Sequence, residues 1–271
     1  MKLATKLSVV ALLIGAAASS YAATYSGNGM IYSTNGAFTG VVGGGSLTLT
    51  DDGTTVFGTF TKGPDNSATG TGIGGGNGQF NNNLVIYIDS VAGGFADTSG
   101  FKDTQDGSRK AISGYNNTTQ FSVMTFAPGF LPDYGISLRS TPTDSFGGLW
   151  GLANGAANSL PFKQNVTLSP LATSTAATYT FSFTLANIGL TPGAGESFNL
   201  FGTFVSNTGN RSGEAIAGND VATTATLKGF VPFTQTAFVP YTTTVVVPEP
   251  SILALFGISG LVAVRAIRRK R

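Results

Sequence analysis

The chain has 271 residues, of which none is cysteine or histidine. This excludes disulfides, thiol chemistry, Ser-His-Asp and Cys-His nucleophilic sites, and the zinc and haem sites that need these ligands. The formal net charge of +2 is misleading, because 7 of the 15 basic residues lie in the first six and last seven positions. Residues 23–247 carry 8 basic and 12 acidic side chains, a net charge of −4, which is poorly suited to nucleic-acid binding.

The N-terminus has the layout of a secretory signal peptide over residues 1–22. Lys2 and Lys6 precede an apolar core that runs from Leu7 to Ala18, and small residues at Ser20 and Ala22 provide a cleavage site. We expect this signal helix to be removed after Ala22 and the rest of the chain to be exported. An uncleaved anchor is the weaker alternative, because the apolar core is short for a bilayer span.

Residues 23–240 are predicted to form an all-β domain, an antiparallel β-sandwich of jelly-roll-like topology. Glycine, threonine, serine and asparagine are abundant, which is typical both of extracellular β proteins and of disorder. The 20 Phe and 8 Tyr residues recur at strand-like intervals and favour a folded domain. Many short candidate strands, separated by turn residues and without helical periodicity, indicate the sandwich.

Three candidate strand regions are the clearest. Leu47 and Leu49 alternate with hydroxyl residues before Asp51-Asp52-Gly53, and residues 54–61 follow, which predicts a hairpin. Residues 84–88 form an apolar run that predicts a central strand, and residues 178–185 alternate aromatic with hydroxyl side chains. The other predicted strands are 120–126, 134–138, 166–168, 198–205, 222–227 and 238–247. The glycine-rich stretch 63–78 predicts a long loop, and residues 241–247 an extended linker.

Three short motifs are interpreted as surface loops. Gly70, Gly72 and Gly75 satisfy a dinucleotide-binding pattern, but no helix pattern follows them. Residues 97–100, Asp-Thr-Ser-Gly, have one residue more than an aspartic protease signature and no second copy. The S-x-x-K spacing over residues 99–102 lacks the companion motifs of a Ser-Lys acyl enzyme.

Two further residue sets are weak ligand candidates. Asp103 and Asp106 could hold Ca²⁺, but the other carboxylates of a calcium loop are missing, so a solvated turn is the favoured interpretation. Trp150, Tyr134 and Tyr115 are candidates for a platform on which sugar rings stack, although a lone tryptophan in a β protein more often belongs to the core. The surrounding region, 84–150, resembles bacterial surface sandwich modules related to carbohydrate-binding domains.

The C-terminus combines a rigid acidic motif, an apolar segment and a basic end. Pro248 and Pro250 keep Glu249 extended and accessible. Residues 251–264 carry no charge and predict a transmembrane helix of roughly 21 Å, short of the ~30 Å hydrocarbon core. The basic residues that follow predict a cytoplasmic C-terminus; they are Arg265, Arg268, Arg269, Lys270 and Arg271.

Residues 248–271 resemble the sorting signal of PEP-CTERM proteins of Gram-negative bacteria, with Pro248, Glu249 and Pro250 as its motif. The resemblance implies recognition by an exosortase, a membrane-embedded cysteine protease, in bacteria that make exopolysaccharide. It implies anchoring in the inner membrane before processing, followed by a place in the cell envelope or outside the cell. Nothing about the preceding domain follows from it.

We expect a non-enzymatic structural or adhesive protein that uses no cofactor and is associated with exopolysaccharide or a biofilm matrix. One alternative is a carbohydrate-binding sandwich module. A second is a hydrolase that uses carboxylates, since a pair could be formed from the 12 acidic residues, although no motif singles one out.

Overall fold

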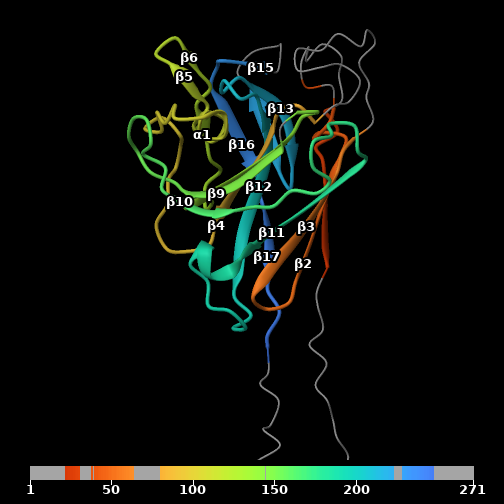
Figure 1. Cartoon of the computed structure of the whole chain (residues 1–271). Coiled ribbons are helices and arrows are strands. Elements are labelled where there is room, and N and C mark those ends of the chain that lie inside the picture. The colour runs from red at the N-terminus through yellow and green to blue at the C-terminus, as the bar shows by residue number, and fades with distance from the viewer. Residues whose placement is uncertain are drawn as a thin grey trace, which may run out of the picture.

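The computed structural model describes residues 22–30, 38, 40–63, 80–143, 145–222 and 228–246 (Figure 1). These residues form mostly β-strands, with one α-helix and one short 3-10 helix. The elements are β1 (Ala23–Ser26), β2 (Ser46–Asp51), β3 (Thr55–Thr61), β4 (Asn83–Asp89), α1 (Gly107–Ser113), β5 (Tyr115–Asn117), β6 (Gln120–Phe121), β7 (Met124–Thr125), β8 (Tyr134–Ser140), β9 (Ser145–Gly151), β10 (Phe162–Asn165), β11 (Thr178–Thr184), η2 (Leu185–Ile188), β12 (Ser197–Val205), β13 (Arg211–Ile216), β14 (Asn219–Ala222), β15 (Lys228–Gly229), β16 (Phe233–Ala237) and β17 (Val239–Thr242).

The strands form two main sheets. Sheet A is antiparallel with the order β1-β2-β3-β11, and sheet B has the order β10-β9-β8-β4-β12-β13-β15, with β17 also paired to β12. A small third sheet, β14-β16-β7, is called sheet C. The all-β class is confirmed, while the jelly-roll-like topology stays a prediction. The signal helix, the C-terminal transmembrane helix and nearly all of the predicted loop 63–78 lie outside the described residues.

The centre of sheet B is buried on both faces, which explains the continuous apolar sequence of its central strand β4. Leu84, Ile86 and Ile88 belong to the core shared with sheet A. Val85 and Tyr87 point the opposite way, into a second core with α1, sheet C and long loops. Side chains alternate along a strand, so a strand between two cores needs apolar residues at nearly every position.

Two predicted strand regions match the structure closely. The predicted hairpin is β2 and β3, and Gly53 in its turn has a φ of 82°, a conformation that glycine adopts without strain. The alternating segment is β11, with its aromatic side chains buried and its hydroxyls turned outward. In both regions one face meets the core and the other meets solvent, which is the arrangement that alternation predicts.

Other local predictions were wrong. Residues 166–168 are no strand, although Ser169 beside them forms an isolated bridge to Thr180. The predicted strand 120–126 is split into β6 and β7. The predicted strand 222–227 stays a prediction, because all of it except Ala222 lies outside the described residues. Helix α1 and strands β9 and β13 were missed, because α1 is only two turns long, β9 is rich in glycine and β13 contains buried charges.

The stem predicted over residues 241–247 is packed against the domain as far as it is described. Strand β17 pairs with β12, and the Thr244 N–H donates to the buried Asp51 carboxylate at 2.8 Å. Near the other end of the chain, the Tyr25 hydroxyl of β1 donates to the Pro240 carbonyl of β17 at 2.8 Å. The described chain therefore enters and leaves the domain on the same side (Figure 1).

Candidate functional site

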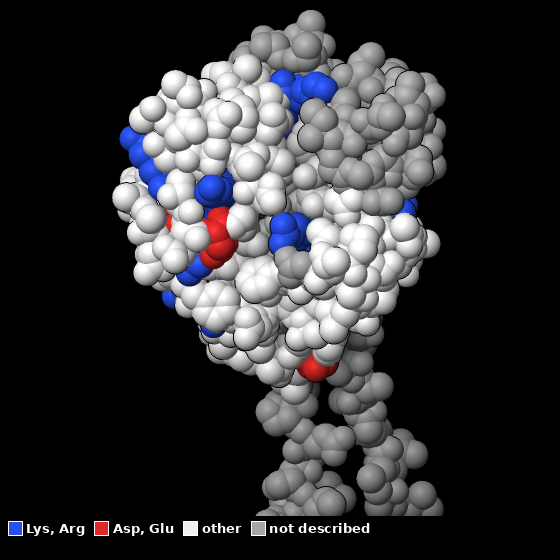
Figure 2. All heavy atoms as spheres, turned by 45° about the horizontal axis from the view of Figure 1, so that its top comes forward, with Lys and Arg blue, Asp and Glu red and all other residues white. Residues whose placement is uncertain are grey.

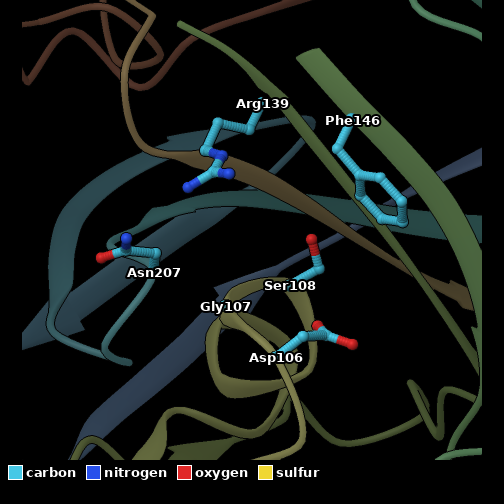
Figure 3. A pocket seen from close by; sticks show the side chains of 6 residues that line it. All are labelled: Asp106, Gly107, Ser108, Arg139, Phe146 and Asn207. Carbon is cyan, nitrogen blue, oxygen red and sulfur yellow. The ribbon is translucent and has the colours of Figure 1, made fainter. Parts of the chain in front are cut away.

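A hollow of about 280 Å³ opens beside the start of α1 (Figure 3). The helix start contributes Asp106, Gly107 and Ser108, β8 contributes Arg139, β9 contributes Phe146, and the turn after β12 contributes Asn207. Phe146 is 38% exposed. In Figure 3 the Ser108 hydroxyl points from the helix toward the strands. The lining can offer hydrogen bonds and one ring to a small polar molecule.

Local sequence fixes the helix at the base of this hollow. The Asp106 side chain caps α1 by accepting the Arg109 backbone N–H at 2.8 Å. A Cβ at Gly107 would lie 2.9 Å from the Cβ of Asn207, so glycine permits the close approach of that turn. Gly114 ends the helix in the left-handed conformation, and its N–H donates to the Lys110 carbonyl at 2.8 Å.

Asp103 lies beneath the helix and is completely buried, which corrects its interpretation as part of a solvated turn. Its carboxylate accepts the backbone N–H groups of Asn158 at 2.7 Å and Leu160 at 2.9 Å. Arg109 approaches it at 3.5 Å and also contacts Asp106. The two candidate calcium ligands therefore serve a loop crosslink and a helix cap. No group of three acidic side chains placed to hold a metal occurs among the described residues.

Trp150 is 1% exposed, so it offers no stacking surface. The Arg109 guanidinium lies 5.5 Å from the centre of its ring. Phe146 and Phe162 lie beside the ring, with centroid distances of 6.0 and 5.8 Å. Trp150 is thus a core residue beneath a partly exposed aromatic rim.

The other two residues of the predicted sugar platform lie elsewhere. Trp150 is paired with Gly135 across β8 and β9, so the neighbouring Tyr134 must point to the opposite face of sheet B. Tyr134 accordingly packs against the core shared with sheet A. Tyr115 packs edge-on against Phe121, at 5.1 Å between centroids, on the separate β5-β6 hairpin. The three aromatics do not form one platform.

The sequence did not reveal a buried polar cluster behind sheet B. The Arg211 Nη2 donates to the Tyr87 hydroxyl at 3.2 Å, and that hydroxyl donates to the Ile112 carbonyl at 2.6 Å. Nearby, Asp220 accepts from the Thr203 hydroxyl at 2.8 Å, and burial raises the pKa of Asp220 to about 7 although Arg211 lowers it. At most 1% of any of these residues is exposed, so the cluster ties α1 to sheet B rather than meeting a substrate.

Glu214 is a second buried charge that sequence reasoning missed. Its carboxylate accepts three backbone N–H groups, from Gly40 at 2.9 Å, Val42 at 2.8 Å and Gly43 at 3.0 Å. Burial outweighs these bonds and raises its pKa to about 8. The available sequence signal was the pair of charged residues Arg211 and Glu214, three positions apart in an otherwise small and apolar run over residues 211–216.

One described pair of carboxylates interacts at the end of β4. The Asp133 carboxylate accepts the Val91 N–H at 3.1 Å, and Asp89 accepts the Leu131 N–H at 3.3 Å. Burial raises the pKa of Asp133, and the charge of Asp89 adds to the effect. Both groups hold loop backbone, and neither lines the hollow at α1.

Comparison with known families identifies the C-terminus. Residues 246–271 match the family model of the PEP-CTERM protein-sorting motif. The chain carries a PEP-CTERM sorting signal. The matched range contains Pro248, Glu249, Pro250 and the basic end, all of which lie outside the described residues. No curated protein and no solved structure matches the chain.

The PEP-CTERM match confirms the predicted family resemblance. Proteins with this signal are exported and recognised by an exosortase, and this applies to the present chain. Within the described segments, no helix has the length and apolar character that a membrane crossing needs. The predicted transmembrane segment, 251–264, is outside those segments.

Proposed function

We propose that this chain is a non-catalytic structural or adhesive protein of the cell envelope or extracellular matrix, associated with exopolysaccharide. The observation that carries the proposal is the sorting signal attached to a β domain. In the described part of that domain, Asp89, Asp103, Asp133 and Glu214 hold backbone N–H groups. Carboxylates that hydrogen-bond to the backbone in this way favour a scaffold over a hydrolase, because a hydrolase would need two carboxylates facing each other in an open cleft.

The placement of the chain ends supports a tethered domain. The Tyr25–Pro240 hydrogen bond brings the strand after the predicted signal peptide next to the strand that leads to the sorting signal. A domain held from that side leaves its other surfaces free for contacts in the matrix. On the face that Figure 2 presents, charged side chains are few and most of the described surface is uncharged.

The sorting step is tested with Glu249→Ala expressed in a producing strain that has its exosortase. We expect the variant to keep its C-terminal tail, by intact mass, and to remain with the membrane fraction. Val245→Ala is the control, since Val245 is 56% exposed and lies just before the matched range. Normal tail removal in Glu249→Ala would contradict the role of the motif.

The matrix association is tested in a strain that cannot synthesise its exopolysaccharide. We expect the processed protein to move from the matrix fraction to the culture medium, while tail removal continues. Unchanged partition between matrix and medium would contradict the association without affecting the sorting claim.

The carbohydrate-binding alternative remains a second candidate, but not through Trp150. A different surface, the outer face of sheet A, favours it.

A further inference from the structure

The outer face of sheet A is an array of hydroxyl groups. Alternate residues of its strands point away from the core, and every outward position except Phe57 is serine or threonine. The hydroxyl residues are Thr24, Ser26, Ser46, Thr48, Thr50, Thr55, Thr59, Thr61, Thr178, Thr180, Ser182 and Thr184. We call this surface the hydroxyl face.

Strand register places these side chains in rows. One row crosses the sheet through Thr24, Thr48, Thr59 and Thr180, and the bridge to Ser169 extends it by a fifth hydroxyl. Neighbouring members are about 4.8 Å apart, and successive rows about 7 Å apart, from the spacings of paired strands and of alternate residues. The face therefore repeats regularly in two directions.

A groove of about 370 Å³ runs along the hydroxyl face. Phe57 stands in it on a central strand of sheet A, between Thr50 and Ser182, and is 46% exposed. No lining residue is charged; the groove is lined by Phe57, Gly58, Thr59, Thr167, Ser169, Thr180, Phe181 and Ser182. A large exposed ring surrounded by uncharged hydroxyls is an unusual composition for a surface that meets only water.

The composition points to one class of partner. A hydroxyl group both donates and accepts hydrogen bonds, as the hydroxyls of a sugar do, and an aromatic face packs well against an apolar face of a sugar ring. The lining offers no cation to an acidic polymer, and one phenylalanine is too little apolar surface for the core of a protein interface. Regular rows suit a polymer with repeating units better than a single small molecule.

We infer that the hydroxyl face binds a neutral polysaccharide, with Phe57 as the stacking residue and its neighbouring hydroxyls as hydrogen-bonding partners. The biological setting rests on the proposed matrix function. The binding itself is a property of the folded domain and can be measured separately.

The test is native affinity electrophoresis of the full-length chain in detergent micelles. The gels contain hydroxyethylcellulose or galactomannan as neutral polymers, or alginate as an acidic one. We expect at least one neutral polymer to retard the protein and alginate to leave it unaffected. Phe57→Ala should weaken the binding roughly tenfold, because one stacking contact and its apolar burial are lost.

Phe162→Ala is the matched control, because Phe162 is 48% exposed but lies on β10 of sheet B. It should bind like the unmodified chain. Phe57→Tyr keeps the ring and should restore binding. Thr59→Val combined with Thr180→Val removes two hydroxyls while keeping β-branched shape, and should weaken binding with little change in the thermal midpoint.

The inference is overturned if neither neutral polymer retards the chain, or if Phe57→Ala binds as tightly as Phe162→Ala. Retardation by alginate alone would also overturn it. So would the finding that a second copy of this chain covers the hydroxyl face in solution. Loss of matrix association in cells with intact binding in the gels would instead count against the proposed function, so the two failures are distinguishable.

Discussion

Glu214 offers the most demanding test of the packing between sheet B and the loop before β2. Its side chain is fully buried and accepts three backbone N–H groups, from Gly40, Val42 and Gly43. Glu214→Ala would leave these donors without a partner, at about 1–3 kcal/mol each when they stay buried. Because water can enter the space vacated by the side chain, we take the lower end, a loss of about 3 kcal/mol in the free energy of unfolding.

Glu214→Gln should lower the free energy of unfolding less than Glu214→Ala does. The amide oxygen can take the place of Oε2, which accepts from Val42 and Gly43, while the NH₂ group then faces the Gly40 N–H. One backbone N–H is left without an acceptor in place of three, so the loss should be about 1 to 2 kcal/mol.

Thermal unfolding followed by circular dichroism at about pH 6 measures the effect. A loss of ~3 kcal/mol corresponds to about 6–12 °C in a domain of this size. Glu196→Ala is the control, since this exposed carboxylate accepts one backbone N–H, from Thr191, and should change the unfolding free energy by less than about 1 kcal/mol. Equal midpoints for Glu214→Ala and Glu196→Ala would refute the reasoning.

Three further predictions concern stability. Burial raises the pKa of Glu214 to about 8 and of Asp220 to about 7, so the folded state binds protons more readily than the unfolded state. The thermal midpoint should therefore fall as pH rises from about 5 to about 9. A constant or rising midpoint would contradict this. Asp103→Ala should lower the free energy of unfolding by about 2–4 kcal/mol, because buried N–H donors and Arg109 lose the Asp103 carboxylate. Millimolar Ca²⁺ should leave the thermal midpoint of the unmodified chain unchanged. A Ca²⁺-dependent rise in the midpoint would restore the calcium hypothesis. Trp150→Ala should lower the free energy of unfolding, measured by chemical denaturation, by about 3–5 kcal/mol, as truncation of a core side chain does. A loss below about 1 kcal/mol would contradict the placement of Trp150 in the core.

The sequence predicted best the elements whose two faces meet different surroundings. In β2, β3 and β11 the alternation of apolar and hydroxyl residues is the direct consequence of a core on one side and solvent on the other. The run in β4 also identified a central strand, because both faces are buried. These patterns are local, so they can be recognised in the sequence without knowledge of the rest of the fold.

The sites depended on long-range contacts, which a linear pattern does not contain. Asp103 looked like part of a solvated turn because its partners, Asn158 and Leu160, lie more than fifty positions away. Trp150 and Tyr134 were predicted to share one sugar-stacking platform, but pairing of β8 with β9 sends them to opposite faces of sheet B. The rows of the hydroxyl face likewise exist only once the register of sheet A is known.

The central claim is that the C-terminal signal is a processing label on an exported β domain. The most direct measurement is the intact mass of the protein recovered from a producing strain and from its isogenic strain without exosortase. The claim predicts a product without its C-terminal tail in the first strain and a tail-bearing product in the second. The same tail-bearing mass in both strains would contradict it.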